Sequence, residues 1–192
     1  MEDHQRTVGA NPVESIKILY VAKRRFDPSA GERWERYVAW SGLTQLRELV
    51  SLDTMLCPTV PQDLIAADWE HNVHGDYQIN YFRSLEYLRR RVAAEADLQI
   101  LAIVQQPTAI DIENGPTGFS LVGFDVLDVH GDVSALTNCG GFDDVFAKAE
   151  LSPLGLVSEL DRAYEIQRDL RTRYPYEPHA ECDVWAIWRP NH

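Results

Sequence analysis

One short run of residues in the chain has the composition of a reactive thiol site. The run TNCGG, residues 137–141, carries a cysteine beside two glycines and stands just before a predicted helix. A cysteine at a helix N-terminus has a lowered thiol pKa, because the exposed amide N–H groups stabilise the thiolate. The two glycines would let a substrate approach the backbone. The pattern therefore predicts a nucleophile at Cys139.

A base and an acid for this nucleophile follow in the C-terminal part of the chain. His179 would take the thiol proton, and Asp183 or Glu181 would orient the imidazole. The order Cys, His, acid is similar to that of papain-like hydrolases, although the residues flanking Cys139 match no papain-type signature. The resulting alternative function is a cysteine-dependent hydrolase or transferase. The simpler interpretation is that Cys139 is a small buried residue at a turn.

Two histidines among carboxylates form a second group with possible chemistry. His71 and His74 lie three residues apart, so a helical backbone would place both on one face, with Asp76 close by. Imidazole and carboxylate ligands suit a divalent metal, which is the alternative to the main expectation of no cofactor. Another interpretation is a hydrated acidic loop in which the histidines pair with neighbouring carboxylates.

Acidic residues clearly outnumber basic ones. The chain has 18 Lys and Arg against 30 Asp and Glu, which gives a formal net charge of −12. No Lys or Arg occurs in residues 51–82 or 92–147. The negative electrostatic field of such a protein repels the phosphate backbone of nucleic acids, so we expect no nucleic-acid ligand. The same field attracts a basic protein. The plainer alternative is a negative surface that only keeps the protein in solution.

The sequence predicts where a basic partner would bind. Acidic side chains interleave with aromatic ones, and tryptophan and tyrosine dominate the energetics of protein interfaces. The residues of this predicted contact region are Asp63, Asp68, Trp69, Glu70, Asp76 and Tyr77, with Asp111 and Glu113 in a later loop. The main functional expectation is therefore a protein that binds a basic protein, either a neutralising protein of the immunity type or an adaptor. It rests on charge and size and on no motif.

Several protein classes and locations are disfavoured. The chain has no P-loop, no dinucleotide-binding glycine fingerprint and no G-x-S-x-G elbow. No apolar run reaches the roughly 18 residues of a membrane span, and the polar N-terminus lacks the features of a signal peptide. The three cysteines, Cys57, Cys139 and Cys182, are too few for a disulfide framework. We therefore expect a cytoplasmic protein without membrane association.

Strands and helices that must position these side chains alternate without a strict βαβ pattern. This favours an α+β fold with a largely antiparallel sheet. Residues 1–14 are expected to form a flexible tail, and residues 15–192 a single domain. Apolar runs predict strands near 16–26, 98–105, 119–129, 133–138 and 183–189. Helical spacing predicts helices near 44–51, 84–94, 142–151 and 158–174.

The order of these elements suggests how they pack. The strands near 98–105, 119–129 and 133–138 are expected to pair consecutively as an antiparallel meander. The strand 183–189 is apolar on both faces, which indicates an interior strand with Trp185 and Trp188 in the core. Trp34 and Trp69 are instead expected at the surface. In the last helix, Asp169 and Arg173 have the spacing of an ion pair.

Overall fold

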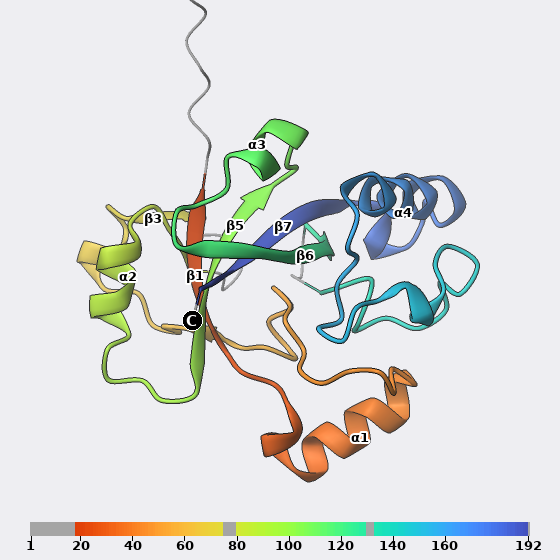
Figure 1. Ribbon diagram of the computed structural model, residues 1–192, viewed down its shortest axis with the longest axis horizontal. Coiled ribbons are helices and arrows are strands. Elements are labelled where there is room, and N and C mark those ends of the chain that lie inside the picture. Colours follow the sequence, from red (N-terminus) through yellow and green to blue (C-terminus); the bar gives the residue numbers. More distant parts are fainter. Residues whose placement is uncertain (1–17, 75–79, 130–132, 192) are drawn as a thin grey trace, which may run out of the picture.

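A central sheet with helices around it forms the fold of this chain, shown by a computed structural model in Figure 1. The structure describes residues 18–74, 80–129 and 133–191, so the predicted tail 1–14 lies outside the described residues. The strands are β1 (Leu19–Arg24), β2 (Thr59–Val60), β3 (Asn72–His74), β4 (Tyr81–Phe82), β5 (Leu98–Gln105), β6 (Phe119–Asp128) and β7 (Cys182–Pro190). The α-helices are α1 (Glu32–Ser41), α2 (Leu85–Arg91), α3 (Ala109–Glu113) and α4 (Leu160–Arg173). Short 3-10 helices are η1 (Pro28–Ala30), η2 (Ala66–Asp68), η3 (Lys148–Glu150) and η4 (Pro178–Ala180).

The sheet confirms the predicted α+β class. Its strand order is β3-β4-β1-β5-β7-β6, and β2 pairs with β1. Every strand pair is antiparallel. β1, β5, β6 and β7 match four of the strands expected from the sequence. None of the helices in the described part of the chain is long and apolar enough to cross a membrane.

The predicted meander is wrong, because β7 lies between β5 and β6. β5 and β6 each run antiparallel to β7 and are therefore parallel to each other, and α3 lies in their connection. The predicted strand 133–138 is reduced to an isolated bridge between Ser134 and Leu127. After it the chain turns, since the N–H of Asn138 donates to the carbonyl of Ser134. β7, which is apolar on both faces, therefore occupies an interior position in the sheet where both of its faces are covered.

Side chains of β7 alternate between two apolar layers, as the sequence predicts. Ala186 and Trp188 pack in the cluster that contains residues of α1 and α4, whereas Trp185 and Ile187 pack in the cluster on the other face. Trp34 also belongs to the first cluster, so its predicted surface position is wrong. It packs edge-on against Phe26, because α1 turns this side chain toward the core.

Two predicted helices are confirmed with small shifts in their ends. α2 begins after Ser84, whose hydroxyl accepts a hydrogen bond from the N–H of Tyr87. α4 covers most of the span 158–174, and Arg173 lies 3.5 Å from Asp169 as the spacing predicts. The Ser84 cap supports the start of α2, whereas α4 has no side-chain cap and forms where its apolar stripe is buried.

The predicted helix 44–51 is wrong. α1 precedes it and ends at Ser41, and the C-cap residue Gly42 has a left-handed φ of 69°. In the following segment the N–H of Arg47 donates to the carbonyl of Pro153, and that of Leu49 donates to the carbonyl of Phe26. Hydrogen bonds to distant parts of the chain thus replace the bonds of a local helix. The spacing of the leucines reflects the burial of their side chains and does not indicate a helical backbone.

Candidate functional site

The most specific chemical arrangement in the structure is a contact between a thiol and an imidazole. The Sγ atom of Cys139 lies 2.9 Å from Nε2 and 3.8 Å from Nδ1 of His179. Cys139 follows β6 in the chain, and His179 lies in η4, just before β7. Because β6 and β7 are antiparallel neighbours, with Asp128 opposite Cys182, the end of one strand brings its following segment to the start of the other. The pairing of β6 with β7 therefore places Cys139 next to His179.

Burial keeps both groups of this pair uncharged at neutral pH. The pKa of the Cys139 thiol is raised to about 11, mainly by burial and in addition by the carboxylates of Asp53 and Asp128. Burial also lowers the pKa of His179, although nearby carboxylates, Asp128 foremost, oppose the shift. The predicted lowering of the thiol pKa is therefore wrong. No helix begins directly after Cys139, so no helix dipole is available there to stabilise the thiolate.

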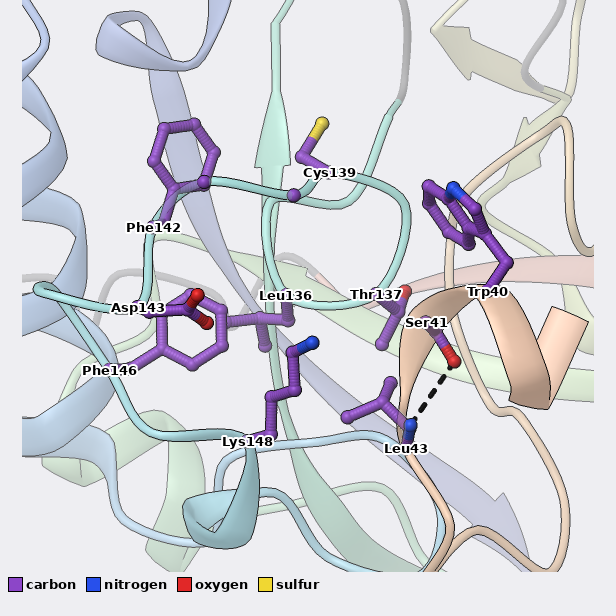
Figure 2. A pocket seen from close by; sticks show the side chains of 12 residues that line it. Trp40, Ser41, Leu43, Leu136, Thr137, Cys139, Phe142, Asp143, Phe146 and Lys148 are labelled. Carbon is purple, nitrogen blue, oxygen red and sulfur yellow. Dashed lines mark hydrogen bonds between the residues drawn. The ribbon is translucent and has the colours of Figure 1, made fainter.

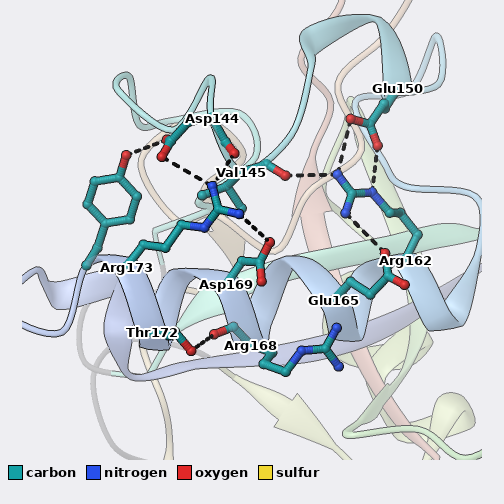
Figure 3. A network of polar contacts seen from close by, with 10 residues as sticks. Asp144, Val145, Glu150, Arg162, Glu165, Arg168, Asp169, Thr172 and Arg173 are labelled. Carbon is teal, nitrogen blue, oxygen red and sulfur yellow. Dashed lines mark hydrogen bonds and ion pairs between the residues drawn. The ribbon is translucent and has the colours of Figure 1, made fainter.

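The segment 142–151 replaces the predicted helix with an irregular chain that arginines of α4 hold in place (Figure 3). Arg162 donates to the Glu150 carboxylate at 2.6 Å and to the carbonyl of Val145 at 2.9 Å. Arg173 donates to the carbonyl of Asp144 at 2.7 Å. Because these carbonyls bond to guanidinium groups, the segment does not need the hydrogen bonds of a helix. It runs from the thiol to η3 and forms one wall of a cavity.

Two hydrogen bonds hold the cysteine segment on its other side. The hydroxyl of Tyr37 in α1 donates to the carbonyl of Thr137 at 2.8 Å. The side-chain amide of Asn138 donates at 2.9 Å to the carboxylate of Asp53, which is buried. Sequence reasoning missed Tyr37 and Asp53, because both lie far from Cys139 in the chain. Only the sheet and α1 bring them together.

A cavity of about 120 Å³ lies beside Cys139 (Figure 2). Its lining combines apolar, glycine and polar residues from α1 and from the segment after β6: Trp40, Ser41, Leu43, Leu136, Thr137, Cys139, Gly140, Gly141, Phe142, Asp143, Phe146 and Lys148. A dry apolar cavity of about 150 Å³ holds a benzene molecule, so this space suits a group of similar or smaller size.

Backbone donors lie next to the thiol. The N–H groups of Cys139, Gly140 and Gly141 form no hydrogen bond with any residue that the structure describes. Gly141 has a φ of 100°, a conformation that side chains rarely adopt. These N–H groups are therefore available to a ligand oxygen at the cavity.

The predicted orienting acid is bonded elsewhere. Asp183 accepts hydrogen bonds from Gln105 at 2.5 Å and from Gln106 at 2.6 Å, and its carboxylate lies 3.8 Å from Arg171. Within the described part of the chain, no hydrogen bond joins Asp183 to His179. Asp128, at the end of β6, is the carboxylate with the largest electrostatic effect on His179. The other predicted acid, Glu181, accepts a hydrogen bond from Val129 through its backbone carbonyl.

The predicted metal ligands do not form a site among the described residues. The backbone at Asn72–His74 is the strand β3, so the helical spacing expected of His71 and His74 is wrong. The ring of His71 stacks on Tyr87 with centroids 4.1 Å apart. Asp76 lies outside the described residues. In the described ranges, no group of three or more His, Cys, Asp or Glu could hold a metal ion.

The predicted contact region for a basic partner is divided by the structure. Asp68 is completely buried, where Tyr87 donates to it at 2.7 Å and Arg91 at 3.2 Å, so its predicted surface role is wrong. A carboxylate with this many donors is stable inside the protein and is hidden from a partner.

Other residues of the predicted contact region lie at the surface. Asp63, Trp69, Glu70 and Glu113 are exposed. Asp111 instead caps α3, since its carboxylate accepts hydrogen bonds from the N–H and the hydroxyl of Thr108. Asp76 and Tyr77 lie outside the described residues. Asp63, Trp69 and Glu70 therefore lie close to η2 in the chain, whereas Glu113 lies at the end of α3.

Fold and site together define an α+β protein with a cysteine–histidine pair beside a small cavity. Comparisons of the chain with models of protein families, with curated proteins and with solved structures found no match. The function is therefore inferred from the chemistry of the side chains in this site.

Proposed function

We propose that this protein is a cysteine-dependent hydrolase or acyl transferase, with Cys139 as the nucleophile and His179 as its general base. The observation that carries the proposal is the 2.9 Å contact between Sγ and Nε2. A nucleophile and a base at hydrogen-bonding distance are the signature of covalent catalysis. The adjacent cavity and the available backbone N–H groups support the same chemistry.

The reaction follows from this geometry. Sγ attacks the carbonyl carbon of an ester or amide while Nε2 of His179 accepts the thiol proton. The backbone N–H groups near Cys139 stabilise the charge that forms on the carbonyl oxygen. The imidazolium then donates its proton to the leaving alcohol or amine, and a thioester remains on Cys139. Water or a second nucleophile resolves the thioester while His179 removes its proton.

Neutrality of the pair determines what His179 must do. A thiol with a pKa of about 11 has almost no thiolate at pH 7, so the proton must leave during the attack. Burial lowers the pKa of His179 and keeps the imidazole free to accept that proton. General base catalysis of this kind contributes about 100-fold to 10,000-fold in rate. Asp128 stabilises the imidazolium that forms.

Acylation by p-nitrophenyl acetate tests the proposal. We expect intact-mass analysis to show one acetyl group, and peptide mapping to place it on Cys139 and not on the buried Cys57 or Cys182. His179→Gln should slow this acetylation by about 100-fold. The matched control is His71→Gln, which removes a histidine that stacks on Tyr87 away from the thiol. Acetylation that spares Cys139, or that His179→Gln leaves unchanged, would overturn the proposal.

A second candidate function is the binding of a basic protein, as the charge pattern predicts. The observation that favours it is a pair of exposed apolar side chains at η2, Ile65 at 55% and Trp69 at 59% exposure. The exposed acids Asp63 and Glu70 lie beside them in the chain. An apolar centre with acidic neighbours fits a basic partner.

This second candidate is tested by retention of a basic protein from the native host at moderate and at high salt. A specific partner should be lost as salt rises, because exposed charges are screened. Trp69→Ala should abolish retention, whereas the control Tyr176→Ala, which removes a side chain that is 99% exposed, should not. Retention that survives Trp69→Ala at both salt concentrations would contradict binding at η2.

A further inference from the structure

We infer that the cavity beside Cys139 binds a small dipolar group that carries both an ammonium and a carboxylate, as the skeleton of an α-amino acid does. This inference rests on the proposed function, because it names the substrate class of the same site. The substrate would be a side-chain ester or side-chain amide of a small amino acid, because the ammonium and the carboxylate of the skeleton must both stay free. Its two charges would lie in the cavity, and its acyl carbon would reach the Sγ atom of Cys139.

Two opposite charges line the cavity without an ion-pair partner in the described structure. Lys148 and Asp143 are the charged side chains of the lining, and in Figure 2 both extend toward the space between the walls. Neither takes part in the ion pairs formed by the described residues, whereas the nearby acids Asp144 and Glu150 pair with arginines of α4 at 3.4 and 2.6 Å. The cavity therefore offers one positive and one negative charge to a ligand.

A buried hydroxyl provides an independent sign of a polar ligand. Thr137 is only 2% exposed and lines the cavity, and its Oγ1 atom has no hydrogen-bond partner in the described structure. Buried polar atoms are nearly always hydrogen-bonded in folded proteins. The amine or carboxylate of a ligand would supply the missing partner. An entirely apolar ligand would leave this hydroxyl unsatisfied.

The size of the cavity and the net charge of the protein restrict the kind of ligand further. A space of about 120 Å³ is slightly smaller than the cavity of about 150 Å³ that takes benzene, so it admits about six heavy atoms. This excludes a nucleotide or a peptide segment. The net charge of −12 repels a simple anion, whereas a dipolar group has no net charge. The apolar walls at Leu43, Leu136 and Phe146 suit a short aliphatic chain.

Binding to the full-length Cys139→Ala protein tests the inference without any need for the thiol. The probes are L-2-aminobutyrate, butyrate and propylamine, which share a short alkyl chain and differ in charge. We expect amide NMR shifts at residues 136–148, with the tightest binding for L-2-aminobutyrate. Each charge lies at an exposed position, so its partner should contribute about twofold to fivefold in affinity.

Single-charge variants show which residue recognises which group. Lys148→Gln should weaken L-2-aminobutyrate and butyrate by about twofold to fivefold and leave propylamine unchanged. Asp143→Asn should weaken L-2-aminobutyrate and propylamine by a similar factor and leave butyrate unchanged. Arg168→Gln is the control, since this exposed arginine of α4 does not line the cavity.

The outcomes separate this inference from the proposed function. Equal binding of the three probes, shifts outside the cavity, or variants without charge selectivity would overturn the inference. None of these results bears on acetylation of Cys139, which is measured on the wild-type thiol. Conversely, selective binding in a protein whose Cys139 is never acetylated would support the dipolar site and overturn the enzyme proposal.

Discussion

Nε2 of His179 lies 2.9 Å from Sγ of Cys139, and the two groups face each other without charge. Burial disfavours both the thiolate and the imidazolium, so the resting pair is a thiol and an imidazole. The reaction rate of such a neutral pair depends on pH and on the base differently from the rate of a preformed thiolate–imidazolium ion pair.

That difference gives a prediction for the pH dependence of acetylation. His179 has a pKa below the usual value of about 6.5, so the wild-type rate should rise only at acidic pH and then remain level above about pH 7. His179→Gln should instead show a rate that rises about tenfold per pH unit toward the thiol pKa of about 11. The measurement is the rate of p-nitrophenolate release by both proteins. A level profile in the variant would contradict a base role for His179.

Thr137→Val should make the free protein more stable and the site less effective. The hydroxyl of Thr137 is buried without a partner, and replacing it by a methyl group of similar shape removes a desolvation cost of about 1 kcal/mol. Urea unfolding should therefore show a higher free energy of unfolding. Binding of L-2-aminobutyrate should weaken by about fivefold, because a hydrogen bond to the ligand is lost. A destabilised variant with unchanged binding would contradict both expectations.

Arg162→Ala should loosen the cavity wall. This partly buried guanidinium binds the Glu150 carboxylate and the carbonyl of Val145, so its loss leaves Val145 without this donor and Glu150 with the N–H of Ala147. We expect a loss of about 1 to 2 kcal/mol in the free energy of unfolding and faster hydrogen exchange in residues 142–151. Arg168→Ala is the matched control on α4 and should change stability by less than about 0.5 kcal/mol. Equal effects of the two variants would show that the α4 contacts do not hold the segment.

Asp68→Asn should reduce stability at neutral pH more than at acidic pH. Burial raises the pKa of Asp68, but hydrogen bonds from Ile65, Tyr87 and Arg91 outweigh burial and lower the pKa overall. A carboxylate with a lowered folded-state pKa stabilises the protein above its unfolded pKa of about 4, and this stabilisation is lost as the pH falls through the folded value. The variant should lose about 3 kcal/mol at pH 7, because Arg91 keeps its charge without a buried partner.

Urea unfolding of both proteins across the acidic range measures this effect of Asp68. The difference between wild type and variant should shrink as the pH falls below about 4. Asp63→Asn, at an exposed position in the same region, is the control and should stay close to wild type at each pH. A constant difference across the range would contradict the assigned pKa shift.

Much of the fold could be read from local pattern. The continuous apolar runs of β5 and β7 predict buried strands because a strand covered on both faces excludes water from every side chain. The apolar stripe of α4 and the cap of α2 likewise act within a few residues. The helices predicted at 44–51 and 142–151 were wrong because their carbonyls and N–H groups bond to distant parts of the chain.

Residue types alone predicted Cys139 as a candidate nucleophile and His179 as its candidate base, and the α+β class followed from the pattern of strands and helices. Only the tertiary structure decided that the two side chains meet, that their environment raises the thiol pKa, and that Asp183 is bonded elsewhere. The physical reason is that burial and hydrogen bonding at this site come from β6, β7 and α1, which are far apart in the chain. The local sequence indicates which side chains are buried, whereas the contacts that each side chain makes depend on how the strands of the sheet pair.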